Sequence, residues 1–574
     1  MKTRNKLYDK SRLRLLCLLT ALLGLFSAGQ TWAGNLTTLT VGNISISESG
    51  YWLTNADDGT LTADGASAEN YNVYYDGNGT LTLNNATITG EGISDYGECI
   101  YANGDLTIVL EGSSTVKGYT VGDSRGICVL DGNLTIQGGG SLTAQGADTS
   151  GGASYGISVS GSFTQQSGSV AAIGGTSQNY GSTGLDVSGT VTVQSGTLVA
   201  TGGNAGNSYG SYGICANGTV TVNDAIVTAT AGTGQSSYGL YVSANVSFPT
   251  PSVTIFGNGS LTARSGTATS EAGGIYVLNP FGSAGSVTVG DNSTLLANSV
   301  ILYVYDDISW SWTEKPLAPN GNGSWLIYGQ SNQPSAVGGN YTLKENITIP
   351  SDAKVTIPEG STLTIPEDKT LTADANQLVV NGELVLEGTF DNAKELEGSG
   401  NLVLGEITLT DDEGIGAYED YQLKLKSKKV TYVRALSDNS QYGTICLPFV
   451  PTSVAGGQVT YYQVEKLESD EITLVETDFE AGKPLFYQTS GTGDITFSAE
   501  SAAGVELVTI PATDSFMEGT MSEVIPNAGY FLKNNNIYPI TDGVQVKVKS
   551  FRAYVKGQND ASQASVMSVN VARP

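Results

Sequence analysis

Residues 155–175 read YGISVSGSFTQQSGSVAAIGG, and the theme at their start, Tyr-Gly-Ile-x-Val-x-Gly, returns about every 29 residues through the first half of the chain. The anchor glycines of the successive units are Gly97, Gly126, Gly156, Gly184, Gly213, Gly239 and Gly274. A period of roughly 20–50 residues is typical of solenoids. Solenoids place equivalent residues in rows along their surface, so we expect a functional site to be a row of side chains.

Each unit contains three apolar runs of three to five residues, separated by glycine, serine and asparagine. In GTVTV, Val220 and Val222 point to one side of the run, and Thr219 and Thr221 point to the other. This alternation is typical of β-strands with one buried face. Three strands per unit predict an all-β fold, a parallel β-helix stabilised by stacking of its coils. Its interior would take Ile157, Val159, Leu185, Val187 and Ile214.

The repeat extends in both directions along the chain. TLTLNNATITG at residues 80–90 has the same strand-turn-strand shape, and ITIPSDAK, VTIPEGST and LTIPEDKT follow one another with a period of eight from Ile347. Three units of eight residues make one 24-residue coil. We therefore predict a parallel β-helix over residues 34–300 and a continued β-solenoid over residues 341–408.

Two stretches interrupt this periodicity. Residues 301–340 hold Trp310, Trp312 and Trp325, and we interpret them as an inserted hairpin or a joint between two solenoid parts. Beyond residue 420 the runs are longer, as in QLKLKSKKVTYV and GVQVKVKSFRAYV, and their alternation predicts an antiparallel β-sandwich over residues 420–574. Lysines of the first run would protect a strand edge; they are Lys424, Lys426, Lys428 and Lys429.

The N-terminus has the pattern of a secretory signal peptide. Six basic residues lie within residues 2–14, an apolar run follows from Leu15, and a small-residue cleavage site precedes Gly34. Removal of residues 1–33 would lower the formal net charge from −28 to −33. We expect a secreted or cell-surface protein without a transmembrane helix, and such acidity argues against nucleic acid as a partner.

The chain contains no histidine. This excludes imidazole as a general base and every metal site that needs histidine. Four cysteines follow the signal segment, too few for a disulfide scaffold. Cys99 and Cys128 fall near corresponding places in adjacent units, so a disulfide between them and two free thiols are both open readings.

Tyrosines recur near one coil corner, in loops that are rich in Ser, Gly and Asn. Such tyrosines offer flat amphipathic faces that suit a long polysaccharide, or they stack on one another and stiffen the corner. The candidate binding residues are Tyr155, Tyr180, Tyr209, Tyr212 and Tyr238. Trp310, Trp312 and Trp325 are a second candidate set, either as a sugar platform or as packing within the joint. The acid pairs Asp57/Asp58, Asp306/Asp307 and Asp411/Asp412 are calcium candidates or solvated turns.

GNLTIQGGGSLTAQG and YGICANGTVTV resemble the coils of bacterial right-handed parallel β-helix carbohydrate-binding domain proteins of the polygalacturonate-binding type. The resemblance covers roughly residues 70–300 and implies a right-handed coil, a glycan partner, and calcium bound by acidic loops. Here the loops read SGGAS, SQNYGST and GNAGNSYGS, without carboxylates, so we expect no cofactor and leave calcium open. YGTICLPFVP, FEAGKPLFYQ, VIPNAGYFLK and SFRAYV resemble a terminal β-module of gut Bacteroidales surface proteins.

Parallel β-helices include polysaccharide lyases and hydrolases, which need a basic residue beside an acid cluster or two carboxylates on one face. Residues 36–300 hold three scattered basic residues, Lys117, Arg125 and Arg264, and residues 149–270 hold two acids, Asp186 and Asp224. We therefore expect a non-catalytic protein that binds glycan or acts as an adhesin. A β-helix lyase or hydrolase and a structural stalk remain the alternatives.

Overall fold

The computed structural model describes residues 35–90, 97–280, 285–306, 311–329, 335–416, 418–436, 441–468, 471–491, 493–541, 545–557 and 566–572. The predicted signal segment lies outside these residues. The chain divides into two compact units, Met1–Gly323 and Ser324–Pro574, and this division falls inside the predicted joint at residues 301–340. Among the described residues, the only helices are two short 3₁₀ turns, and none has the length and apolarity of a membrane span.

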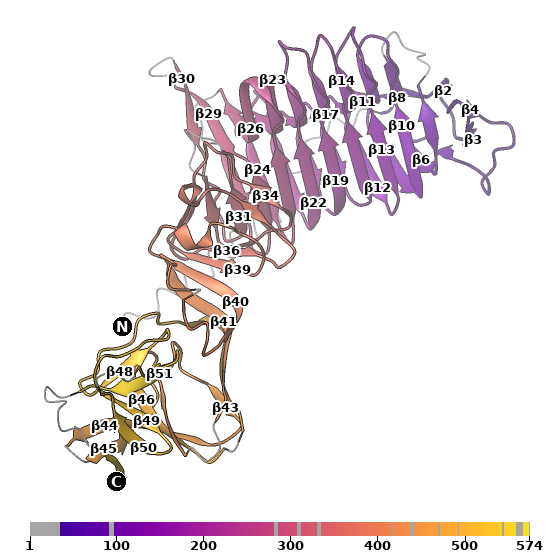
Figure 1. Ribbon diagram of the computed structural model, residues 1–574. Helices are drawn as coiled ribbons and strands as arrows, with labels where there is room; N and C mark the ends of the chain where they lie inside the picture. Colours follow the sequence, from indigo (N-terminus) through magenta and orange to yellow (C-terminus); the bar gives the residue numbers. More distant parts are fainter. Residues whose placement is uncertain are drawn as a thin grey trace, which may run out of the picture. The chain divides into compact units, whose positions relative to one another are not determined.

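The first unit is a parallel β-helix with three strands per coil (Figure 1). Sheet 1 contains β8 (Gly97–Asn103), β11 (Ser124–Leu130), β14 (Ser154–Val159), β17 (Ser182–Val187), β20 (Ser211–Ala216), β23 (Gly234–Ser243), β26 (Ala268–Asn279) and β29 (Val300–Asp306). Sheet 2 contains β6 (Thr80–Asn84), β9 (Leu106–Glu111), β12 (Leu134–Gly138), β15 (Phe163–Gln165), β18 (Val191–Val193), β21 (Thr219–Asn223), β24 (Ser252–Phe256) and β27 (Ser286–Val289). Sheet 3 contains β7 (Thr87–Thr89), β10 (Ser113–Lys117), β13 (Ser141–Gln145), β16 (Ser169–Ile173), β19 (Gly196–Thr201), β22 (Ala225–Thr230), β25 (Ser260–Arg264) and β28 (Thr294–Ala297).

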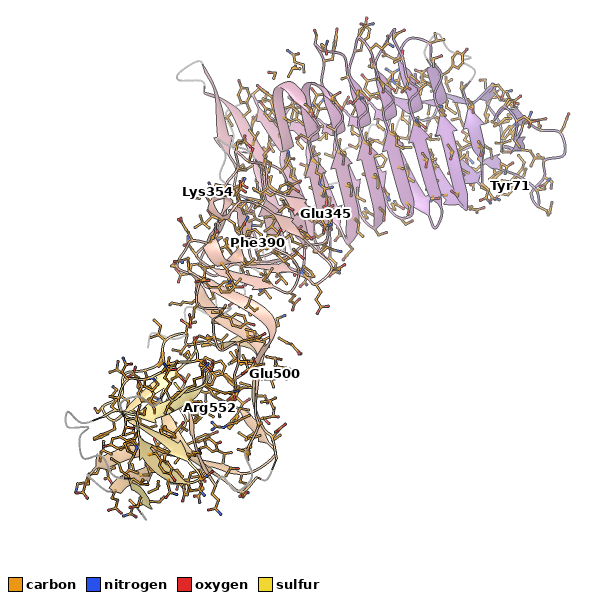
Figure 2. All side chains as sticks on the ribbon, in the orientation of Figure 1. Tyr71, Glu345, Lys354, Phe390, Glu500 and Arg552 are labelled. Carbon is orange, nitrogen blue, oxygen red and sulfur yellow. The ribbon has the colours of Figure 1, made fainter. Side chains whose placement is uncertain are left out.

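The interior of the coils is a set of apolar rows that run from coil to coil. Ile127, Ile157, Leu185 and Ile214 occupy one register position of sheet 1, and each is fully buried. Val220 and Val222 are buried in sheet 2, whereas Thr219 and Thr221 of the same strand are not. The predicted all-β parallel fold is therefore confirmed, with the alternation that the sequence indicates (Figure 2). Each buried aliphatic side chain of this kind stabilises the fold by about 1.5–3 kcal/mol.

Both ends of sheet 1 within the first unit are antiparallel, which the periodicity does not reveal. β1 (Thr38–Val41) pairs antiparallel with β8 and with β2 (Ile44–Ile46), and β30 (Ser311–Pro316) pairs antiparallel with β29. Sheet 2 likewise continues from β6 into antiparallel β5 (Val73–Tyr75) and β3 (Gly50–Thr54), which also pairs with β4 (Leu61–Thr62). Residues 38–75 thus form a cap, where the sequence predicts coils from residue 34.

The anchor glycines from Gly126 to Gly274 lie within the sheet 1 strands, where the strand passes close to the backbone of sheet 3. A Cβ on Gly184 would fall 2.5 Å from the Thr201 backbone nitrogen, and one on Gly156 would fall 2.2 Å from that of Ile173. Only glycine permits this approach. One predicted anchor is wrong: Ile127 pairs with Ile100, so Cys99, not Gly97, is in register with Gly126.

The cysteines of the described residues are free thiols. Cys99 and Cys128 are both buried and unpaired, so the open question of a disulfide between them is answered in favour of free thiols. Cys99 is in register with Gly126, and Cys128 is in register with Tyr101, so the two cysteines do not occupy equivalent positions. Burial raises the pKa of each thiol to about 12, which leaves both neutral at physiological pH.

The second unit begins with β31 (Ser324–Ile327) and β32 (Ser335–Gly338), which pair antiparallel, and continues with short parallel coils. β34 (Ile347–Thr348) pairs with β37 (Leu371–Thr372), so residues 24 positions apart stack as the period-eight repeat predicts. The remaining strands of these coils are β33 (Asn340–Thr342), β35 (Val355–Ile357), β36 (Thr362–Ile365), β38 (Leu378–Val380) and β39 (Glu383–Leu386), with the turns η1 (Ala375–Gln377) and η2 (Ala393–Glu395).

A seven-stranded sheet follows from these coils into the C-terminal part. β40 (Asn401–Leu409) lies parallel to β41 (Lys424–Arg434), and β41 lies antiparallel to β47 (Ile495–Glu506), which also pairs with β43 (Ser453–Ala455). The prediction that the lysines of β41 protect an edge is wrong, because β41 has neighbours on both sides. Lys426 and Lys429 instead pair with Glu383 (3.9 Å) and Glu406 (3.2 Å), and Lys428 pairs with Glu387.

The C-terminal part contains two further sheets that share one hydrophobic core. One consists of β42 (Tyr442–Ile445), β44 (Val459–Leu467), β45 (Glu471–Glu476), β46 (Leu485–Thr489) and β52 (Ser568–Val571); the other of β48 (Met517–Thr520), β49 (Tyr530–Lys533), β50 (Asn536–Pro539) and β51 (Arg552–Val555). β45 and β52 are parallel, so the predicted purely antiparallel pairing is wrong for this pair, and the sandwich arrangement stays a prediction. Residues 545–549, expected in a strand, hold only a bridge from Val548 to Val524.

Candidate functional site

The outward face of sheet 1 carries a row of tyrosines from β20 to β29. Because the strands are parallel and in register, residues at one outward position stack on one another. Tyr212 pairs with Tyr238, and Tyr241 pairs with Tyr276. Neighbouring ring centroids lie 4.5–6.1 Å apart. We call this set the tyrosine ladder; its members are Tyr212, Tyr238, Tyr241, Tyr276 and Tyr303.

The ladder is packed more tightly at its centre than at its ends. Tyr238 and Tyr276 are 3% and 6% exposed, whereas Tyr212, Tyr241 and Tyr303 are half-buried. The Tyr238 hydroxyl donates a hydrogen bond to Glu271 Oε2 at 2.5 Å. Burial raises the pKa of Tyr212 to about 12 and raises the pKa of Tyr238 further, where the bond to Glu271 adds to burial. These hydroxyls are therefore neutral donors at physiological pH.

Tyr180 and Tyr209 form a separate, exposed pair in the loops that precede β17 and β20. Their rings lie 5.3 Å apart, and they are 41% and 44% exposed. The loops are held by main-chain bonds, such as that from the Gly206 N–H to the Tyr180 carbonyl. We call these two residues the corner pair. A row of rings on a rigid corner presents apolar surface to solvent without burying it.

The corner pair and the tyrosine ladder meet at Gly210. The Tyr212 ring lies over this glycine, so closely that a Cβ on Gly210 would fall 2.3 Å from the Tyr212 hydroxyl oxygen. Gly210 directly follows Tyr209 of the corner pair. The half-buried start of the ladder therefore begins beside the loop that carries the exposed Tyr209 ring.

Tyr155 does not join this surface, because Thr183 occupies the position between it and Tyr212. The Arg125 guanidinium lies over the Tyr155 ring, 5.1 Å from its centroid, and forms ion pairs with Glu98 (3.1 Å) and Asp123 (2.8 Å). Burial raises the pKa of Tyr155 to about 12. Tyr155 thus packs against the Arg125 guanidinium, which the ion pairs with Glu98 and Asp123 hold in place.

Only one of the three tryptophan candidates, Trp325, has a described side chain. Trp310 lies outside the described residues, and Trp312 belongs to β30, without a described side chain. Trp325 in β31 packs its indole on Gly338 of the antiparallel partner β32, where a Cβ would fall 2.0 Å from the ring. The half-buried Trp325 therefore serves the packing of this hairpin.

A buried serine row lies directly beneath the candidate surface, and the sequence prediction missed it. Each serine accepts a backbone N–H from the loop that leads into the following coil, and the four from Ser154 to Ser237 also donate to a carbonyl of the loop before their own strand. Ser182 Oγ donates to the Gly175 carbonyl at 2.7 Å and accepts from the Gly203 N–H at 2.8 Å. The row consists of Ser124, Ser154, Ser182, Ser211 and Ser237, all fully buried. Its signal in the sequence is a serine two residues before each of the five anchor glycines from Gly126 to Gly239.

The central coils do not bring two carboxylates together. Asp186 lies on the outward face of sheet 1 between Ser158 and Cys215 in register. Burial raises its pKa, while the Cys215 thiol and Arg125 act in the opposite direction. Glycosidases need a second carboxylate facing the same bond, and neither in-register neighbour supplies one. Among the described residues, no three Asp, Glu, Cys or His side chains are grouped so that they could hold a metal ion.

The fold defines the protein as an all-β solenoid built on a parallel β-helix, with an aromatic surface along one sheet. No family model, curated protein or solved structure matches the chain. The resemblance of residues 70–300 to polygalacturonate-binding β-helices thus stays a prediction.

Proposed function

We propose that this is an exported, non-catalytic protein that binds a polysaccharide or surface glycan through the corner pair and the adjoining tyrosine ladder. The observation that carries this proposal is the exposed ring pair of Tyr180 and Tyr209, with the half-buried Tyr212 ring over the adjacent Gly210. Tyrosine rings supply a flat stacking face and a hydroxyl at small entropic cost. Export rests on the signal pattern of residues 1–33.

The charge distribution of the coils favours a glycan with few charges at this surface. Residues 149–270 hold Asp186, Asp224 and Arg264 as their only charged side chains. Ser and Asn of the same loops offer hydrogen-bond donors and acceptors that a sugar hydroxyl can use. A row of equivalent positions suits an extended chain of sugar units better than a single small molecule.

The test is binding of the full chain without residues 1–33 to a panel of soluble and insoluble polysaccharides, with calcium and with chelator. The variant Tyr180→Ala/Tyr209→Ala should weaken binding by about 10- to 100-fold, because two exposed aromatic contacts together contribute roughly 1.4–2.8 kcal/mol. The matched control is Ile226→Ala, which removes an exposed apolar side chain from the outward face of sheet 3.

Equal loss in the control, or unchanged affinity in the tyrosine variant, would refute the assignment of this surface. A folded native chain that binds no polysaccharide of the panel would refute glycan binding itself. Loss of binding in chelator would show that calcium takes part, which the sequence leaves open.

A further inference from the structure

The C-terminal part of the second unit contains a cavity of about 460 Å³ with a basic lining. Five cationic side chains border it, and among the described residues no Asp or Glu lines it: Arg434, Lys533, Lys547, Lys549 and Arg552. The whole chain has 27 basic and 55 acidic residues, so a cavity with this lining opposes the composition of the protein. We propose that this cavity binds an oxyanion group, a carboxylate, sulfate or phosphate, carried on a small organic molecule.

Arg434 is fixed in place at the cavity. Its guanidinium lies over the Tyr487 ring, 4.7 Å from the centroid, and donates a hydrogen bond to the Thr444 carbonyl. Tyr487 is almost fully buried, and Gly443 gives its ring room, since a Cβ there would fall 2.4 Å from the tyrosine oxygen. A guanidinium held in one orientation loses little freedom when it binds an oxyanion.

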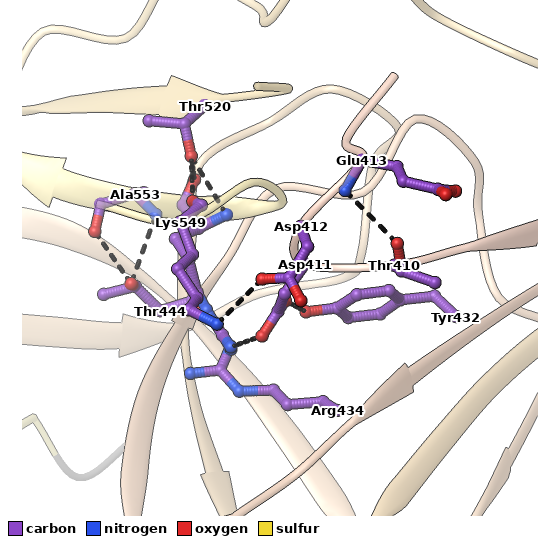
Figure 3. A network of polar contacts seen from close by, with 11 residues as sticks. Thr410, Asp411, Asp412, Glu413, Tyr432, Arg434, Thr444, Thr520, Lys549 and Ala553 are labelled. Carbon is purple, nitrogen blue, oxygen red and sulfur yellow. Dashed lines mark hydrogen bonds and ion pairs between the residues drawn. The ribbon is translucent and has the colours of Figure 1, made fainter. Parts of the chain in front are cut away.

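Arg552 forms an ion pair with a half-buried acid, Asp411. Its Nη2 pairs with Asp411 Oδ2 at 2.5 Å, and Tyr432 donates to the other oxygen of Asp411 at 2.6 Å (Figure 3). Among the described residues, the other terminal nitrogen of Arg552, Nη1, is buried and has no acceptor. Arg552 lies in β51, among the strands of the C-terminal part (Figure 2). An unsatisfied donor of this kind gains from an added oxyanion.

Within the part of the chain that the structure describes, fewer carboxylates than cations lie at the cavity. Asp412 pairs with Lys549 at 3.1 Å, and Glu523 pairs with Lys547 at 2.8 Å. With Asp411, these carboxylates engage three of the five lining cations. The acid pair Asp411/Asp412, a calcium candidate by sequence, thus serves as the counter-charge of two basic residues. The remaining positive charge is available to attract an anion.

The rest of the lining suits the organic part of such a ligand. Apolar side chains alternate with the cations, among them Leu436, Phe531, Val546 and Ala553. Ligand pockets are typically about 300–1,000 Å³ with apolar walls and a few placed polar groups. Guanidinium groups bind carboxylate, sulfate and phosphate through paired N–H donors, whereas lysines contribute point charges. The cavity therefore matches the chemistry shared by these oxyanions.

The experiment is calorimetric titration of the full chain without residues 1–33, using sodium sulfate, inorganic phosphate, glucuronate and, as the neutral counterpart of glucuronate, glucose. We expect binding of oxyanions but not of glucose, weakening as salt rises. The variant Lys533→Ala/Lys547→Ala should lower the affinity at least about tenfold. Lys466→Ala is the control, because this exposed lysine pairs with Glu468 and lies outside the cavity lining.

If glucuronate binds most tightly, the ligand class is a carboxylate. If sulfate or phosphate binds most tightly, the ligand class is a sulfate ester or a phosphate ester, respectively. The proposal is overturned if no oxyanion binds, if glucose binds as well as glucuronate, or if Lys466→Ala weakens binding as much as the cavity variant. The corner-pair variant leaves these lysines intact, so failure of the glycan proposal is distinguishable from failure of this one.

Discussion

The coils of the first unit and the seven-stranded sheet of the second unit both contain parallel strands. The side chains that link neighbouring strands are neutral in the coils and charged in the seven-stranded sheet. The buried row from Ser124 to Ser237 joins coils through neutral hydroxyl groups. β41 joins its neighbours through ion pairs such as Lys429–Glu406. The difference follows from how similar the stacked strands are to one another.

Near-identical repeats place the same residue at the same position in every coil. A repeated charge would then meet its like in the adjacent coil, about 4.8 Å away, and repel it by about 3 kcal/mol at an effective dielectric constant of 20. Neutral Ser, Thr, Tyr and Gly avoid this cost. The strands around β41 differ in sequence, so opposite charges can face each other there. The near-absence of charge in the central coils is thus a requirement of repetition.

The strongest way to break the coils is to fill the space at an anchor glycine. Gly184→Val should destabilise the first unit by more than about 3 kcal/mol, because its Cβ would fall 2.5 Å from the Thr201 backbone nitrogen. Thermal unfolding followed by circular dichroism measures the effect. The control is Gly151→Ala, where a Cβ meets nothing within 4 Å. Equal stability of the two variants would show that close approach does not select glycine at the corner.

The stability of the charged region should instead depend on one half-buried acid, Asp411. Asp411→Ala leaves Arg552 without its ion-pair partner and Tyr432 without its acceptor, and we expect a loss of about 2 kcal/mol in the stability of the second unit. Its neighbour provides the control: the side chain of Asp412 is 85% exposed, so Asp412→Ala should cost less than about 1 kcal/mol. Chemical denaturation of both variants tests this ranking, and a larger loss for Asp412→Ala would contradict it.

The smallest expected effect is on the Tm and concerns Asp186, the one charged side chain on the outward face of the central sheet 1 strands. It tests whether a single charge is costly in the neutral coils. Burial raises the pKa of Asp186 above its ordinary value of 3.8. The ionised carboxylate therefore lowers stability above its folded-state pKa, and this penalty disappears as the pH falls below the unfolded-state value. Asp186→Asn should raise the Tm at pH 7 to 8, with a gain that shrinks as the pH approaches about 4.

The exposed Asp131 is the control for this pH series, since Asp131→Asn should leave the Tm close to that of the native chain throughout. A gain for Asp186→Asn that grows as the pH falls would contradict the sign of the pKa shift.

The coils could be predicted from the sequence because the alternation of apolar and polar residues within each strand identifies its buried face. Val220 and Val222 needed no knowledge of distant residues to be placed inside. The serine row escaped prediction because its meaning lies in contacts between coils, as in the bond of Ser182 to Gly203. The position of β41 also escaped, since its partner β47 lies roughly 70 residues further along the chain.

The candidate site was predicted only in part, for a related reason. Tyr180, Tyr209, Tyr212 and Tyr238 recur before the Gly-Ile step and were found by spacing. Tyr241 and Tyr276 follow that step by two residues, where earlier coils hold Cys215, Asp186 and Ser158, so no repeat marks them. The basic cavity is assembled from β41, β49 and β51 and the residues beside them, which no local pattern connects.

The antiparallel cap at residues 38–75 has a consequence for self-association. An open parallel β-helix would offer unpaired main-chain groups at its end, a template on which another chain could continue the stack into a fibre. Here β1 and β2 cover β8 in the antiparallel direction, and β5, β3 and β4 extend sheet 2 in the same way. The last strands are only two to three residues long. The cap thus converts a repeat that could polymerise without limit into a particle of fixed length.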